Sequence, residues 1–348
     1  MKKVIITGIL GQDGSHLAEY LLSEYQDIQV YGLMKRGSNP NTNNIKSIIG
    51  NPRFKVVLGD ITDQTSMDSL VKSLEPDYLI NFAANSFVGT SWDTPEQVFN
   101  VNTLGVLKCL ESIRKFRPSC RFYSAGSSEE YGETLYNPQD EKHILTPVSP
   151  YGVTKSSARY IVNVYRKSYG LFAVHGTLFN HEGPRRGTEF VTRKITKNIA
   201  SILKNIDQFK PVGGFSLGNI FAKKDLSDSR DMVRGVWAII NHHTPEDFVL
   251  ASGTSRSIAD FVEIGFKTAG YAGNWVYHDD LLQDYFEICV HGVWVKVVTI
   301  DKNLFRPSEV GLQEGNSAKA RSILGWEPRI SFEQMVLDMV ENDKSLIS

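Results

Sequence analysis

The chain has 348 residues and a formal net charge of −1, with 38 Lys and Arg against 39 Asp and Glu. This balance argues against a general affinity for nucleic acid, so we interpret local basic clusters as sites for small anions. The three cysteines, Cys109, Cys120 and Cys289, are too few and too scattered for a disulfide framework or a zinc site, and no metal is expected. No run approaches the ~18 apolar residues of a membrane span, so we expect a cytoplasmic protein with no membrane partner.

The amino terminus has the pattern of a strand, a glycine-rich turn and a helix. Residues 2–7 form a β-branched run, GILGQDG follows at residues 8–14, and residues 15–22 are typical of a helix. The glycines permit a tight turn and let the backbone approach a pyrophosphate at the helix N-terminus. The GxxGxxG spacing meets the dinucleotide pattern only loosely, so a plain strand–turn–helix is the alternative. The cofactor contacts expected here are Gly8, Gly11, Gln12, Asp13 and Gly14.

Strands and helices alternate through the first half, which predicts an α/β fold with a Rossmann-type, doubly wound parallel sheet. The expected strands are residues 28–33, 54–58, 78–82, 121–125 and 172–177, and the expected helices are residues 95–117 and 151–169. From residue 178 the loops lengthen and Gly and Pro cluster. We therefore expect a dinucleotide-binding domain at 1–177 and a smaller, mainly substrate-binding domain at 178–348. Residues 248–251 are expected to return to the main sheet, and residues 318–347 to form helices around Trp326.

Four residues form the candidate catalytic group. Tyr151 and Lys155 are spaced to share one helix face, where the ammonium can lower a tyrosine pKa from near ~10 towards working pH. Ser127 and Glu129 fall just past a strand, at the sheet edge where ligands bind. A phenolate can take a hydroxyl proton, and a carboxylate can remove the proton that a new ketone makes acidic. Alone, the YxxxK spacing is weak, and a Tyr–Lys pair on a solvated helix face is the alternative.

Together these motifs resemble the extended short-chain dehydrogenase/reductases, and more narrowly the GDP-mannose 4,6-dehydratase family over nearly the whole length. The resemblance rests on the glycine turn, SSE at 127–129, SPY at 149–151, LFNHEGPRR at 178–186, FVTRKI at 190–195, FRPSEV at 305–310 and LGW at 324–326. These segments follow one another in the family's order. The second domain would then bind a nucleotide sugar.

The resemblance implies a mechanism. Tyr151, assisted by Lys155, would remove the C4 hydroxyl proton as hydride passes to the cofactor, with Ser127 bridging the C4 oxygen and the phenol. Glu129 would move the C5 proton to the departing C6 hydroxyl, and hydride would return to C6. The substrate would be GDP-mannose or a GDP-manno-heptose. A GDP-sugar 4-epimerase or 4-ketoreductase is the enzymatic alternative, and a dinucleotide-sensing regulator is the non-enzymatic one.

The end of the second strand decides the cofactor. Lys35 and Arg36 suit the 2′-phosphate of NADP, whereas an acidic residue at this position would suit NAD. We therefore expect NADP, with NAD as the other possible cofactor. A solvated basic loop with no cofactor contact is the alternative. The further cofactor contacts that the resemblance implies are Asp60, Ile61, Ala83, Ala84, Ser86, Lys155, His181 and Arg186.

The resemblance also implies residues for the GDP moiety and an assembly. The substrate-binding residues would be Asn180, Lys194, Lys224, Arg306 and Glu309, with Arg306 as a phosphate clamp. Relatives carry Arg and His where this chain has Lys224 and Asp228, which changes charge near the nucleotide and leaves the sugar open. A homodimer or homotetramer is implied, with residues 35–44 as a tetramer contact.

Overall fold

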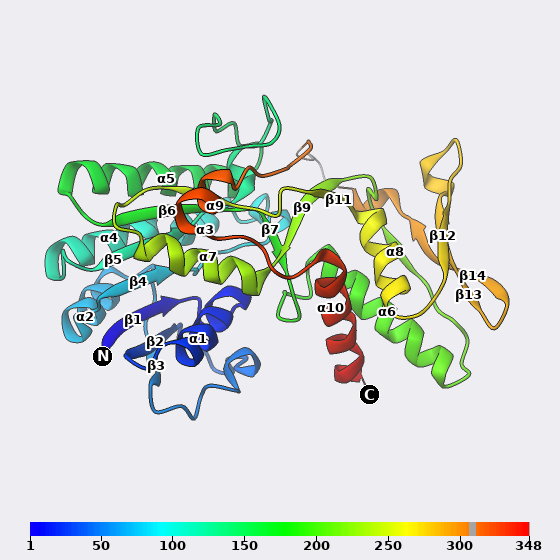
Figure 1. Cartoon of the computed structure of the whole chain (residues 1–348), viewed down its shortest axis with the longest axis horizontal. Coiled ribbons are helices and arrows are strands. Elements are labelled where there is room, and N and C mark those ends of the chain that lie inside the picture. The colour runs from blue at the N-terminus through cyan, green and yellow to red at the C-terminus, as the bar shows by residue number, and fades with distance from the viewer. Residues whose placement is uncertain (306–310, 348) are drawn as a thin grey trace.

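The computed structural model describes residues 1–305 and 311–347 and is built around a seven-stranded parallel sheet (Figure 1). Its strands are β1 (Lys2–Thr7), β2 (Ile28–Met34), β3 (Phe54–Leu58), β4 (Tyr78–Asn81), β5 (Arg121–Ala125), β6 (Ala173–Leu178) and β10 (Phe248–Leu250). They lie in the order β10-β6-β5-β4-β1-β2-β3, with every neighbouring pair parallel. The doubly wound sheet and the return of residues 248–251 to it are therefore confirmed.

Helices cover both faces of this sheet. α1 (Gln12–Glu24) and α7 (Ser229–Asn241) pack on one face, and α2 (Gln64–Leu74), α4 (Gly105–Phe116) and α5 (Pro150–Tyr169) on the other. Successive side chains of β1 point to opposite faces of the sheet. Val4 and Ile6 belong to the hydrophobic cluster under α1 and α7, and Ile5 belongs to the cluster under α2, α4 and α5. Because both faces are buried, the strands are continuous apolar runs rather than alternating ones.

The helix predicted at residues 95–117 is interrupted. It consists of α3 (Pro95–Phe99), a π-helical turn (Asn100–Leu104) and α4. In that turn Asn102 accepts from the Asn85 backbone N–H at 2.9 Å and donates to the Thr154 hydroxyl at 3.1 Å. The π turn thus ties the segment after β4 to α5, a role typical of such turns near functional sites.

The remaining strands form two small sheets, which lie to the right of the large sheet in Figure 1. One contains β7 (Asn180–Glu182), β9 (Lys223–Asp228) and β11 (Ser255–Ser257); the other contains β8 (Phe215–Leu217), β12 (Gly273–Val276), β13 (Tyr285–Val290) and β14 (Val293–Ile300). Their apolar residues share a cluster with α6 (Val191–Asp207), α8 (Ile258–Thr268) and α10 (Phe332–Ile347). The boundary at residue 177 stays a prediction, although β10, α7 and α9 (Ala318–Leu324) lie beyond it and serve the large sheet.

Short 3₁₀ turns occur at Asn43–Ile45, Gly89–Ser91, Ser128–Glu130, Leu281–Gln283 and Lys302–Leu304. α9 and α10 flank Trp326, as the sequence predicts. Within the described ranges, the helices are all too short or too polar to cross a membrane.

Candidate active site

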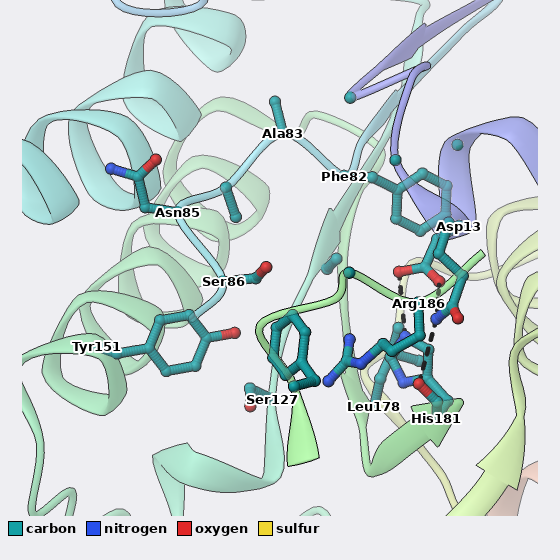
Figure 2. Close-up of a pocket in the computed structure, with 18 of the residues that line it drawn as sticks. Asp13, Phe82, Ala83, Asn85, Ser86, Ser127, Tyr151, Leu178, His181 and Arg186 are labelled. Atoms are coloured by element: carbon teal, nitrogen blue, oxygen red, sulfur yellow. Dashed lines mark hydrogen bonds and ion pairs between the residues drawn. The ribbon is translucent and has the colours of Figure 1, made fainter. Parts of the chain in front are cut away.

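A cavity of about 650 Å³ lies at the carboxyl edge of the large sheet, walled by the segments after β1 to β6, by α5 and by β9 (Figure 2). Nineteen of the residues that the sequence singles out line it: Gly8, Gly11, Gln12, Asp13, Gly14, Lys35, Asp60, Ile61, Ala83, Ala84, Ser86, Ser127, Glu129, Tyr151, Lys155, Asn180, His181, Arg186 and Lys224. The fold therefore brings the proposed cofactor and catalytic groups into one space.

Two of the expected ligand contacts, Arg36 and Lys194, do not line the cavity. Among the described residues, Arg36 is exposed beyond the cavity lining, and the Lys194 ammonium on α6 donates to the Ser216 carbonyl at 2.8 Å. Arg306 and Glu309 lie outside the described residues. The binding roles of these four residues stay predictions.

The glycine turn fits a dinucleotide. Gly8 has a φ of +67°, and a Cβ there would lie 2.9 Å from the Ala83 backbone nitrogen. A Cβ on Gly14 would lie 2.4 Å from the Gly8 carbonyl oxygen, so the turn tolerates no side chain at either position. Gly11 precedes α1 and has no side chain to cap it. The N-terminal N–H groups of α1 can therefore serve a pyrophosphate.

His181 of β7 contacts Asp13 of α1 in the wall of the cavity, and a dashed line in Figure 2 marks this contact. His181 Nε2 lies 3.0 Å from an Asp13 carboxylate oxygen, and its Nδ1 lies 2.7 Å from the Phe179 carbonyl oxygen. Because both partners are acceptors, this position favours the doubly protonated, positively charged form of the imidazole. Burial opposes both charges, yet the attraction between them raises the pKa of His181 and, with Arg186, lowers that of Asp13 to about 2.

Arg186 is held along the same wall. It pairs with Glu182 at 3.0 Å, and its guanidinium lies 3.5 Å from the centroid of the Phe190 ring. Glu182 is 2% exposed and also accepts from the Thr192 hydroxyl at 2.6 Å. These contacts fix a cation at the cavity surface, next to the His181–Asp13 pair (Figure 2).

Tyr151 and Lys155 extend from the first turns of α5, whose N-terminus is capped by Ser149. Both side chains are buried, and the Tyr151 hydroxyl points into the cavity between Ser86 and Ser127 (Figure 2). The Lys155 ammonium donates to the Ala125 carbonyl at 2.7 Å and lies 5.8 Å from the centroid of the Tyr151 ring. The lysine is thus anchored to the end of β5.

In this arrangement of side chains, burial opposes the lowered pKa that the YxxxK spacing predicts for Tyr151. Burial raises the pKa of Tyr151 well above its ordinary value; the Ser127 hydroxyl opposes this rise, and the Glu129 charge adds to it. Burial likewise lowers the pKa of Lys155 to about 8. Both groups lose contact with water on burial. The ammonium donates to the Ala125 carbonyl oxygen at 2.7 Å.

Ser127 and Glu129 belong to one tight turn. β5 ends at Ala125, and the 3₁₀ turn Ser128–Glu130 follows with Ser127 as its N-cap. The Ser127 hydroxyl accepts from the Glu129 backbone N–H at 3.3 Å, and the Glu130 carboxylate accepts from the Ser127 N–H at 2.7 Å. This capping box fixes the backbone from which Ser127 and Glu129 reach the cavity.

Lys224 lies at the catalytic end of the cavity. Its ammonium is 3.7 Å from a Glu129 carboxylate oxygen and 3.5 Å from the Gln313 side-chain oxygen. Asp228 is 1% exposed, caps α7 and pairs with Arg230 at 2.7 Å. Its effect on the charge near the nucleotide stays a prediction.

Sequence reasoning missed two residues of this site. Arg185 lines the cavity and donates to the Ser15 hydroxyl at 3.1 Å, beside the N-terminus of α1. Its place next to Arg186 in a Gly- and Pro-flanked basic segment could have indicated it. Gln313 carries no sequence signal, because only the pairing of its segment with β9 brings it to Lys224.

Known proteins resemble this chain along its length. A family model described as GDP-mannose 4,6 dehydratase matches residues 5–339. The GDP-mannose 4,6-dehydratase of Yersinia enterocolitica is 39% identical over 359 residues, covering 99% of this chain and 94% of that protein. The human GDP-mannose 4,6 dehydratase is 38% identical over 351 residues, covering 99% and 91%.

Solved structures share the fold. A dTDP-glucose 4,6-dehydratase from Bacillus anthracis in complex with NAD has a TM-score of 0.78 at 20% identity, covering 99% of this chain and 97% of that one. A UDP-glucose 4-epimerase from Thermotoga maritima has a TM-score of 0.80 at 21% identity, covering 99% and 100%. The family model and the full-length relatives decide the assignment: this chain belongs to the GDP-mannose 4,6-dehydratase family.

Proposed function

We propose that the chain is a lyase that removes water from GDP-mannose and leaves a GDP-linked 4-keto-6-deoxy sugar. The observation that carries this proposal is the position of Glu129, which lines the same cavity as Tyr151, Lys155 and Ser127. Proton exchange at C4 alone, as in a 4-epimerase or 4-ketoreductase, needs the tyrosine and lysine but no carboxylate for C5. The membership of the family supports the same reaction.

The residues divide the proton transfers between them. A bound nicotinamide cofactor would accept hydride from C4, return it to C6, and in its oxidised form place a positive charge near the phenol. Tyr151 removes the C4 hydroxyl proton, and the Ser127 hydroxyl holds the C4 oxygen. Lys155, anchored on the Ala125 carbonyl, supplies positive charge behind the tyrosine. Together these groups make the C4 ketone.

Glu129 then performs the elimination. The C4 ketone acidifies the C5 proton, which the carboxylate removes and passes to the C6 hydroxyl as that group leaves as water. Glu129 is 6% exposed, which limits the contact of its carboxylate with solvent. With hydride returned to C6, C5 would take up one proton, which balances the proton that Tyr151 removed from the C4 hydroxyl. The cycle would then close with no net change in oxidation state.

We infer that the cofactor is NADP. Lys35 lines the cavity at the end of β2 and forms a 3.0 Å ion pair with Asp60, which lies after β3. Arg36 is exposed beside it. Two cations at this point suit a 2′-phosphate better than the bare ribose of NAD. Asp60 would be available to the adenine ribose once Lys35 turned to the phosphate.

For the GDP moiety we propose Asn180, Lys194, Arg306 and Glu309, as the family resemblance implies. Asn180 lines the cavity, which supports its part. A GDP-manno-heptose presents the same C4, C5 and C6 groups to Tyr151 and Glu129. The same chemistry therefore extends to it if the cavity admits the longer sugar.

We further propose a cytoplasmic homodimer or homotetramer. The outer face of α5 exposes Val153, Tyr160 and Val164 at helical spacing, with exposed fractions of 44%, 61% and 54%. Phe99 and Leu104 are exposed on the adjoining α3 and π-helical turn. An apolar stripe of this kind supports pairing of two copies through these helices.

The test is mass spectrometry of the products formed from GDP-mannose and, separately, from a GDP-manno-heptose. Loss of one water from either sugar supports a dehydratase and identifies its substrate. A product of unchanged mass with an inverted C4 centre would indicate an epimerase instead. The Tyr151→Phe variant serves as the inactive control.

A further inference from the structure

Three polar side chains, those of Glu130, His175 and Arg159, are buried directly behind the catalytic turn. Glu130 from the turn, His175 from β6 and Arg159 from α5 are 0%, 0% and 8% exposed. One Glu130 oxygen accepts from the Ser127 backbone N–H at 2.7 Å and lies 2.9 Å from His175 Nε2. The other lies 3.8 Å from the Arg159 guanidinium. The mechanism above uses none of these three groups.

The cluster fits behind the turn because residue 126 is a glycine. A Cβ on Gly126 would lie 2.3 Å from His175 Nε2 and 2.6 Å from the Glu130 oxygen, so only glycine admits both at the end of β5. Arg159 is anchored on its far side, where it donates to the Glu141 carbonyl at 2.7 Å. The cluster is therefore tied to the backbone on both flanks.

Stability alone is a weak reason for such a cluster. Buried ion pairs lose hydration, and apolar side chains of similar volume often serve a core as well or better. What Glu130 provides that an apolar side chain would not is an acceptor for the Ser127 N–H. That bond sets the backbone of Ser127, and Glu129 is bonded in turn to the Ser127 hydroxyl at 3.3 Å.

We propose that Glu130, His175 and Arg159 form a positioning network that holds Ser127 and Glu129 in register with Tyr151. The inference rests on the proposed function, since it assigns these two residues their roles towards C4 and C5. His175 and Arg159 orient the Glu130 carboxylate, and Glu130 orients the turn. None of the three touches the substrate.

The network also places a negative charge behind the catalytic pair. Glu130 adds to the effect of burial in raising the pKa of Tyr151, and it opposes the effect of burial on the pKa of Lys155. The titratable groups that face Glu130 come from four elements: Tyr123 of β5, Tyr131 after the turn, Tyr151, Lys155 and Arg159 of α5, and His175 of β6. Removing the charge should therefore move the ionisation of Tyr151 to lower pH.

Two substitutions separate geometry from charge. Glu130→Leu removes both the acceptor and the charge, whereas Glu130→Gln keeps an acceptor for the Ser127 N–H. Glu141→Gln is the matched control, because Glu141 contacts the Val249 N–H and Arg159 through its carboxylate and carbonyl but not the turn. Each full-length variant is compared with the wild type by hydrogen exchange of the peptide covering residues 127–131 and by steady-state kinetics over pH.

The network predicts faster exchange of that peptide in Glu130→Leu, together with a kcat lowered by about 10- to 100-fold at little-changed KM. Glu130→Gln should keep most of kcat but shift the limb of the pH profile that reports Tyr151 to lower pH. A purely structural role would lower kcat equally at every pH. Unchanged exchange and unchanged kcat in folded Glu130→Leu would overturn the proposal.

If Glu130→Leu does not fold, the pH profile of Glu130→Gln decides, and an unshifted profile counts against the network. If the wild type removes no water from either GDP-sugar, the proposed function fails. The hydrogen-exchange comparison then still tests whether the network holds the turn.

Discussion

The ammonium of Lys224 lies 3.7 Å from the carboxylate of Glu129. The two residues come from β9 and from the turn after β5, and Gln313 joins them: its amide donates to the Ser128 carbonyl at 3.1 Å and its oxygen lies 3.5 Å from Lys224. A cation therefore stands beside the proposed C5 base. This position differs from the nucleotide contact that the family resemblance implies for Lys224.

Replacing Lys224 by Met tests which role holds. If the ammonium orients Glu129, kcat falls by about tenfold, the equivalent of one lost charge interaction, while KM stays within about twofold. If it binds the GDP moiety, KM rises instead. We expect the fall in kcat, measured as initial rates of water loss from GDP-mannose.

The matched control is Lys223→Met, since Lys223 is exposed on the same strand. It removes the same charge from β9 without touching Glu129, and its kinetics should equal those of the wild type. A raised KM in Lys224→Met with unchanged kcat would return this lysine to the nucleotide site.

Tyr151→Phe should abolish most of the activity. The substitution keeps the buried ring but removes the group that takes the C4 proton, so kcat should fall by at least about 100-fold. Binding of the GDP-sugar, measured by calorimetry, should change little. Tyr169→Phe, at the exposed C-terminal end of α5, is the control and should remain fully active. Substantial activity in Tyr151→Phe would mean that another group removes the proton.

The Asp13–His181 pair should stabilise the fold within a defined pH range. The folded pKa of Asp13 lies below its ordinary 3.8, and that of His181 lies above its ordinary 6.5. The pair's contribution is thus complete between these two ordinary values. It is lost as pH rises through the folded pKa of His181, or falls through about 2.

Denaturant unfolding of His181→Gln checks this dependence. Its deficit in free energy of unfolding relative to the wild type should be largest between pH 3.8 and 6.5 and should shrink in alkaline buffer. His243→Gln, an exposed histidine, should show no such dependence. A deficit that does not vary with pH would mean that the imidazole is not charged in the folded protein.

The NADP assignment predicts a selective loss. In Lys35→Ala/Arg36→Ala, the Kd for NADP should rise by about tenfold or more, because two charged donors to the 2′-phosphate are removed. The Kd for NAD should change little. Lys55→Ala, an exposed lysine on β3, controls for overall charge. Equal weakening of both cofactors would argue for a general electrostatic effect, and tighter wild-type binding of NAD would contradict the assignment.

Much of the large sheet could be predicted from the sequence, because its strands are buried on both faces and appear as short apolar runs. The strands of the two small sheets are harder to predict from the sequence. β7 (Asn180–Glu182) has no apolar pattern and exists through its pairing with β9, which is distant in sequence. β13 does alternate, with Phe286, Ile288 and Val290 buried, and this pattern is typical of a half-buried strand.

The site divides in a similar way. Residues of the glycine turn and of the YxxxK helix could be predicted, because short local patterns place them at the sheet edge. The ion pair between Lys224 and Glu129 could not, since it depends on how β9 packs against the turn after β5. The high tyrosine pKa also escaped prediction, because sequence spacing shows a neighbouring lysine but not burial or the Ala125 carbonyl that holds it.

A single turnover of Glu129→Gln with GDP-mannose and bound oxidised cofactor tests the central claim most directly. That claim is that Tyr151 and Lys155 act in C4 oxidation and that Glu129 acts in the loss of water. Tyr151 and Lys155 remain, so C4 oxidation should proceed and the absorbance of reduced nicotinamide should appear and persist. No water should be lost from the sugar, because the C5 base is gone, whereas the wild type should form the dehydrated product with only transient reduction. Dehydrated product formed by Glu129→Gln at the wild-type rate would contradict the account.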